Sequence, residues 1–233
     1  FSGYFSEYSY NNLNRRTIEY RDITSEYILD YYNTIRDFGG NTDFHYSRKK
    51  FESQTGGQII HHTYIPNKII DIQRGVLNYD SIFNNTNTSS FEAIVFTDNS
   101  INFRTNDFVK FGLRASQFTI AKTTFFVLEP RLSSVITIFP RTKLHGFYGI
   151  NHQNVHFLQA PTMEEFGADS WIPANKFAHP EKSILTSLSI SHVIPKYGLD
   201  VSLELYHKKM NNVIEYKEHI NYFSNLKKNW EDY

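Results

Sequence analysis

The chain has 233 residues and no Cys, and its 24 Lys and Arg residues balance 24 Asp and Glu residues, for a formal charge of zero. The absence of Cys excludes disulfides, thiolate metal sites and Cys nucleophiles, and neutrality argues against a nucleic-acid partner held by charge. No apolar run reaches the roughly 18 residues that a membrane helix needs. The 20 Phe and 16 Tyr residues suit a barrel with aromatic girdles at two membrane interfaces.

The first part of the chain alternates between probable strands and polar stretches. We expect strands over residues 1–10, 34–46 and 56–65. The polar stretch 11–31 is interpreted as a long loop, with a helix over residues 25–32 as the alternative. The stretch 67–90 is rich in Asn, Asp, Ser and Thr, which is typical of a second long loop.

The strand pattern sharpens after residue 90. We expect strands over residues 91–103, 108–120, 126–138, 144–157, 184–194 and 199–216. Tight turns are expected near residues 48–54, 104–107, 140–143 and 195–198, and a long loop over residues 159–182. The total is about nine strands, with antiparallel neighbours as the default for a chain of hairpins.

Side chains in the central strands alternate between apolar and polar with a period of two, which predicts one apolar and one polar face. The residues expected on the apolar face, in contact with lipid, are Val109, Phe111, Leu113, Leu128, Ile136, Leu203 and Leu205. The residues expected on the polar face, pointing into a lumen, are Lys110, Arg114, Glu129, Arg131, Asp200 and Glu204.

The connections between strands favour a membrane barrel. Short turns alternate with mostly long polar loops, as in outer-membrane barrels, where the turns lie in the periplasm and the loops at the cell surface. A soluble extracellular β-sandwich that binds glycans or mediates adhesion remains the alternative, because half-buried strands look alike in both settings. A barrel with a structural or secretion-associated role is a third possibility.

Several runs of residues resemble one family in order and spacing. They are Glu92 with Phe96, Phe111-Gly112-Leu113-Arg114, Leu128-Glu129-Pro130-Arg131-Leu132-Ser133, Tyr148-Gly149, Trp171-Ile172-Pro173 and the run from Leu205 to Tyr216. The chain is similar to the barrel of TonB-dependent outer-membrane receptors of the Bacteroidota type. The resemblance covers most of the chain.

The resemblance implies a fold and a set of partners. The expected fold is all-β, a partial antiparallel transmembrane β-barrel that supplies about nine strands of a barrel of about 22. The implied partners are outer-membrane lipid, the other strands and plug domain of the receptor, and TonB, which contacts an N-terminal segment; a surface lipoprotein is left open. The implied function is import of a nutrient with inner-membrane energy, without enzymatic activity or a cofactor.

We expect residues 1–233 to form one barrel segment without a plug domain. An open sheet of about nine strands has two unpaired edges, and unpaired backbone groups in lipid cost several kcal/mol each. The sequence therefore predicts that further strands complete the cylinder.

Three groups of residues invite a chemical role. His61-His62 and the His152/His156 pair suggest a metal site, but neighbouring residues on a strand face opposite sides and the spacing from His152 to His156 is helical rather than extended. We therefore expect interfacial or loop histidines and no metal. Glu129 and Arg131 are expected to form a charge ladder on the lumen wall rather than a glycosidase site, which needs two carboxylates at a defined separation. Trp171, in a Pro-flanked loop, is expected either to contact a ligand or to pack against neighbouring loops.

Overall fold

The computed structural model of the chain describes residues 1–20, 23–74, 79–84, 87–158 and 170–215. The strands are β1 (Ser2–Tyr20), β2 (Ile23–Arg48), β3 (Phe51–Arg74), β4 (Tyr79–Asn84), β5 (Thr88–Arg104), β6 (Asp107–Ile120), β7 (Thr123–Phe139), β8 (Thr142–Gln153), β9 (Val155–Leu158), β10 (Ser170–Pro173), β11 (Glu181–Ile194) and β12 (Leu199–Asn211), with a 3₁₀ turn at Pro195–Tyr197. In these ranges, no helix is long and apolar enough to cross a membrane.

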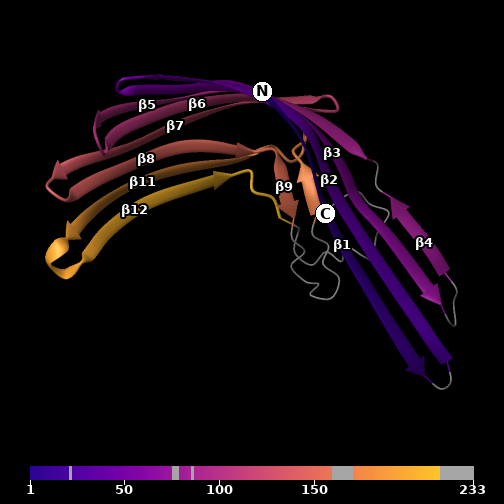
Figure 1. Cartoon of the computed structure of the whole chain (residues 1–233). Helices are drawn as coiled ribbons and strands as arrows, with labels where there is room; N and C mark the ends of the chain where they lie inside the picture. Colours follow the sequence, from indigo (N-terminus) through magenta and orange to yellow (C-terminus); the bar gives the residue numbers. More distant parts are fainter. Residues whose placement is uncertain (21–22, 75–78, 85–86, 159–169, 216–233) are drawn as a thin grey trace.

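Ten strands form one antiparallel sheet in the order β1-β2-β3-β5-β6-β7-β8-β11-β12, with β4 paired to β3. The sheet is arched, and the small β9–β10 hairpin lies beneath the arch (Figure 1). Among the described residues, β1 and β12 each leave one edge unpaired. The predicted open antiparallel sheet is confirmed, and no second large sheet covers it as a β-sandwich requires.

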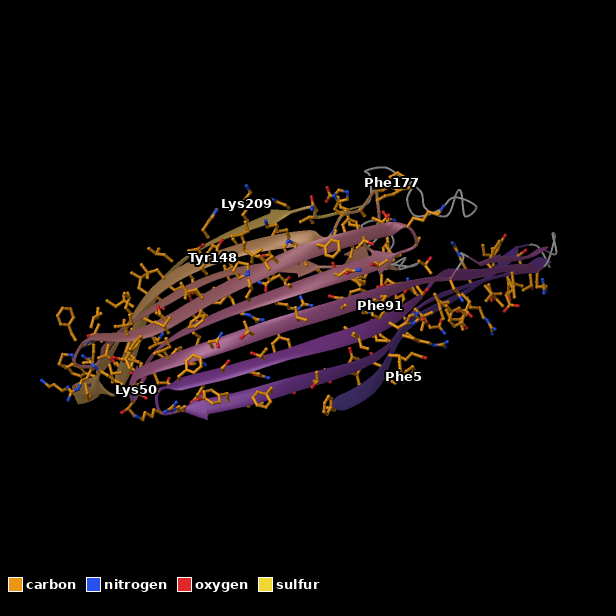
Figure 2. All side chains as sticks on the ribbon, turned by 90° about the horizontal axis from the view of Figure 1, so that it is seen from above. Phe5, Lys50, Phe91, Tyr148, Phe177 and Lys209 are labelled. Carbon is orange, nitrogen blue, oxygen red and sulfur yellow. The ribbon has the colours of Figure 1, made fainter. Side chains whose placement is uncertain are left out.

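The register separates apolar and polar side chains onto the two faces of the arch. On the convex face, Ala115 opposes Leu128 and Leu188 opposes Leu205, and the exposed fractions of Leu128 and Leu205 are 56% and 68%. Figure 2 looks onto this face, with rings such as Phe5 and Phe91 standing on it. On the concave face, Arg114 opposes Glu129, which is 5% exposed.

The apolar band on the convex face has the height of a membrane. On β7, the outward residues from Phe126 to Ile138 are mostly apolar and exposed. At about 3.3 Å per residue this run is about 40 Å long. A strand tilt of about 40° reduces it to about 30 Å along the barrel axis, against an apolar band of about 25 Å in outer-membrane barrels.

The prediction of loops is wrong for two stretches of the chain. Residues 11–31 belong to β1 and β2, which pair without a break from Ser2/Asn41 to Tyr20/Ile23, and the alternative helix over residues 25–32 is strand as well. In the stretch 67–90, β3 continues to Arg74 and pairs with β4. Residues 21–22, 75–78 and 85–86 lie outside the described part of the chain.

The polar composition of the β1–β2 hairpin led to the prediction of a loop, because side chains on both faces of the hairpin are exposed to solvent at its far end. The ribbon carries exposed side chains such as Leu13 and Ile18, and an exposed ion pair joins Arg15 to Glu26 across the strands at 3.3 Å. Backbone pairing stabilises it without a buried face. With 26 residues, β2 is about 85 Å long at about 3.3 Å per residue, so it extends well past any apolar band.

The four predicted tight turns lie at one end of the sheet. They are at Lys49-Lys50, Thr105-Asn106, Pro140-Arg141 and Pro195–Tyr197. Lys50 marks this end in Figure 2, and Phe177 marks the opposite end. The opposite end carries the far end of the β1–β2 hairpin, the connections around β4, β9 and β10 and, among the described residues, one short turn, Ala121-Lys122, between β6 and β7. Which end faces the cell surface stays a prediction.

Glycines let large rings lie flat against the concave wall. Tyr4 opposes Gly39 across β1 and β2, and a Cβ at Gly39 would lie 2.7 Å from the Tyr4 ring. Phe96 opposes Gly56 across β5 and β3, and a Cβ at Gly56 would lie 2.7 Å from its Cζ. A larger residue at position 39 would displace the Tyr4 ring, and one at position 56 would also meet the Thr42 backbone carbonyl at 2.5 Å, so both positions require glycine.

Candidate functional site

A row of charged and polar side chains crosses the concave face on six neighbouring strands. One residue comes from each strand: Asp37 from β2, His62 from β3, Glu92 from β5, Arg114 from β6, Glu129 from β7 and His152 from β8. We call this row the charge ladder. The contacts run between strands, so the sheet register alone brings together residues far apart in the sequence.

Arg114 is the centre of the charge ladder. Its Nη1 donates to Glu129 Oε2 at 2.5 Å and its Nη2 donates to Glu92 Oε1 at 3.1 Å. Both glutamates are buried, with side chains 6% and 9% exposed. Two carboxylates that the wall shields from water therefore share one guanidinium, which makes each contact dependent on the other.

Histidines extend the charge ladder on both sides. His62 Nδ1 lies 2.8 Å from Asp37 Oδ1, and its Nε2 lies 3.5 Å from Glu92 Oε2. On the other side, the His152 backbone N–H donates to Glu129 Oε1 at 2.5 Å. The five acidic and basic groups from β2 to β7 thus share partners, and the arrangement ties neighbouring strands together through their side chains.

The six predicted lumen residues all lie on the concave face by register, but only Arg114 and Glu129 belong to the charge ladder. Arg131 instead pairs with Asp98 at 3.2 Å, and both side chains are about half exposed. Lys110 is exposed, with its ammonium 4.9 Å from the Phe108 ring. Asp200 and Glu204 are exposed on the edge strand β12. Their role in a lumen stays a prediction.

Sequence reasoning missed four members of the charge ladder: Asp37, His62, Glu92 and His152. The polar side of an alternating strand was readable for Asp37 and Glu92, whereas His62 shares its face with Ile60 and Tyr64. The meeting of these residues was not readable, because it depends on how each strand is shifted against the next. His62 also shows that the two adjacent histidines split as expected, since His62 is buried and His61 is exposed on the other face.

A small apolar core closes the concave face near the longer connections. It consists of Phe118, Ile120 and Ala174, with Phe125 packed against it. The β9–β10 hairpin and the segment after it fold inward onto the wall, where Ala174 donates its backbone N–H to the Asn154 carbonyl at 2.7 Å. The part of the predicted loop 159–182 that the structure describes is therefore a packed element; residues 159–169 lie outside the described chain.

Trp171 stands at the centre of an aromatic group in this core. Its ring lies 4.6 Å from that of Phe157 and 6.0 Å, edge to face, from that of Tyr8. Its indole N–H is shielded from solvent and has no hydrogen-bond partner among the described residues. Trp171 thus packs against rings of β1 and β9 and also lines a cavity described below. Whether it contacts a ligand stays a prediction.

Comparisons with known proteins place the fold. No protein-family model and no curated protein matches the sequence, whereas four chains of solved structure match it. One is from the structure of the RagAB peptide transporter, with 10% sequence identity and a TM-score of 0.56 over 96% of this chain. This sheet is part of a β-barrel. The chain spans 28% of the length of that transporter chain, and at this identity the likeness establishes the fold alone.

The burial of His156 predicts that docking of the β9–β10 hairpin on the barrel wall depends on pH. The residue is 2% exposed, and burial lowers the pKa of its imidazole, with the Glu181 carboxylate acting in the opposite direction. The docked hairpin therefore holds neutral His156. An undocked hairpin takes up a proton below about pH 6.5, and the docked one does not, so docking weakens as the pH falls through that value.

We expect amide hydrogen exchange of Trp171 and Ile172 to speed up between pH 7 and pH 5, after correction for intrinsic exchange. In His156→Leu the same amides should show no such dependence. Equal pH dependence in the two proteins would mean that another group controls docking.

Proposed function

We propose that this chain forms part of the wall of an outer-membrane transport barrel that imports a nutrient with energy supplied through TonB. The observation that carries the proposal is the division of one open sheet into an apolar convex face and a concave face crossed by the charge ladder. Outer-membrane barrels have this division, with lipid outside and a polar interior.

The convex face argues for lipid as its environment. It exposes large apolar side chains over several neighbouring strands, among them Phe38, Ile59, Val95, Phe126 and Leu203. Monomeric proteins in water rarely expose a continuous apolar patch of more than a few hundred Å². In a bilayer, exposing these apolar side chains to lipid carries no free-energy penalty, and the height of the apolar band on this face matches that of the hydrocarbon layer.

The unpaired edges support a wall that further strands complete. Among the described residues, no strand pairs with the outer edge of β1 or of β12, and unpaired backbone groups are too costly in hydrocarbon. The proposed partners are further strands and a plug domain of the same receptor, TonB, surrounding lipid and a surface lipoprotein. In this role the charge ladder stabilises the wall and performs no catalysis.

The resemblance of the sequence to TonB-dependent receptors supports the energy source, and the likeness to a peptide transporter makes oligopeptides the first nutrients to test. The substrate would meet the concave face and the inward-folded β9–β10 region first if the longer connections face the outside. That orientation is open to a direct experiment.

We expect the longer connections to lie at the cell surface and the tight turns in the periplasm. The sequence has no native Cys, so single cysteines can be placed at Thr17 and Phe177 and, as matched controls, at Asn106 and Arg141. A membrane-impermeant maleimide added to intact cells should label the first two and not the others. Labelling of the turns alone would reverse the orientation. Labelling of all four positions would contradict the proposal that the protein spans the outer membrane.

A further inference from the structure

A cavity of about 430 Å³ opens between the β6–β7 turn and the segment that follows β10. Tyr64, Ile120, Trp171 and Pro173 supply its apolar side chains, and Lys122 and Lys176 supply its charges. No carboxylate of the described residues lines it. We call it the rim pocket. It lies at the end of the sheet that Phe177 marks in Figure 2.

The apolar side of the rim pocket is held firmly in place. Tyr64 is 1% exposed, and its hydroxyl lies 3.1 Å from Ser90 Oγ. Ile120 belongs to the apolar core with Phe118 and Ala174. Trp171 is wedged between the rings of Tyr8 and Phe157. A site built from buried side chains of this kind is formed before a ligand arrives, which lowers the entropy cost of binding.

The two lysines of the rim pocket are unneutralised. In the part of the chain that the structure describes, neither Lys122 nor Lys176 forms an ion pair. The Lys176 ammonium instead lies 4.4 Å from the Phe177 ring. Two cations beside an apolar surface, with no carboxylate of the described residues lining the pocket, attract an anion that also has an apolar part.

We propose that the rim pocket binds one end of the imported solute, an apolar group that carries a carboxylate. The carboxylate would lie between Lys122 and Lys176, and the apolar group would rest on Trp171, Pro173 and Ile120. This assignment rests on the proposed function, because it requires the rim to be open to arriving solute. It extends that function by naming the chemistry of the solute end that the wall recognises.

The test compares two ligands that differ only in charge. N-acetyl-leucine has a branched apolar side chain and a free carboxylate, and N-acetyl-leucinamide replaces the carboxylate with a neutral amide. Calorimetric titration of the full-length protein in detergent should show binding of the acid at least about tenfold tighter than of the amide, equivalent to about 1.4 kcal/mol.

Lysine variants test whether the acid binds in the rim pocket. Lys122→Glu with Lys176→Glu should weaken binding of the acid at least about tenfold, and Lys122→Gln with Lys176→Gln should have a smaller effect in the same direction. Lys196→Glu, an exposed lysine at the opposite end of the sheet, is the matched control and should leave binding unchanged. Both altered lysines are exposed, so the variants should fold.

Equal binding of acid and amide, or binding that the double variants leave unchanged, would overturn the assignment. Displacement of the acid by inorganic phosphate at similar concentration would show a general anion site and also overturn it. These outcomes are independent of membrane orientation, so the maleimide experiment can support the transport proposal while this one fails, or the reverse.

Discussion

Replacing Arg114 with methionine is expected to destabilise the barrel by about 3–5 kcal/mol, because it leaves two buried carboxylates without their shared cation. Glu92 and Glu129 both accept from Arg114, and their side chains are 9% and 6% exposed. Methionine keeps much of the length and apolar stem of arginine, so the change removes charge rather than volume. The expected measurement is the free energy of unfolding in a reversible detergent or vesicle assay with the full-length protein.

Arg131→Met is the matched control. Arg131 lies on the same face of the neighbouring strand and pairs with Asp98 at 3.2 Å, but the two side chains are 47% and 40% exposed. An ion pair in such contact with water contributes about 0–1 kcal/mol. Comparison of the two methionine variants therefore distinguishes the effect of leaving buried carboxylates unpaired from the effect of losing an arginine at the surface.

A triple variant tests whether the uncompensated carboxylates cause the loss of stability. Arg114→Met combined with Glu92→Gln and Glu129→Gln removes the two uncompensated charges and should recover part of the lost stability. If Arg114→Met and Arg131→Met cost the same, or if the two glutamines restore nothing, the charge ladder does not stabilise the wall in the way described.

The charge ladder has a consequence for how this part of the barrel wall behaves. It links six strands from β2 to β8 on the lumen side by side chains, in addition to the backbone ladder. Backbone hydrogen bonds let neighbouring strands twist, and shared ion pairs between buried groups oppose a change in their spacing. This part of the wall should therefore resist a change in the spacing of its strands.

The central strands were predictable because their side chains carry a clean period of two. In β6 and β7, residues such as Leu113 and Leu128 fall on one face and Arg114 and Glu129 on the other, and no other regular structure produces that pattern. The same logic failed for residues 11–31. There both faces of the hairpin are exposed, so polar residues on either face carry no desolvation penalty. The composition is therefore that of a loop, although the backbone forms strands.

The candidate site was only partly readable, for a different reason. Arg114 and Glu129 lie close in the sequence and on the same face, so their pairing could be anticipated. His62 and Glu92 come from strands separated by a long connection, and their meeting depends on the register of β3 against β5. The rim pocket depends on the inward fold of the segment around Trp171, which no local pattern encodes.

The most direct measurement of the central claim compares arginine on the two faces of β7. Leu128 is exposed on the convex face, and Ser133 lies on the concave face opposite Lys110. In reversible unfolding of the full-length protein from lipid vesicles, Leu128→Arg should cost about 2–4 kcal/mol if it lies near the bilayer midplane. Ser133→Arg should cost much less, because the concave face meets water in the lumen. Equal costs at the two positions would contradict a lipid-facing convex face and, with it, the barrel wall proposed for this chain.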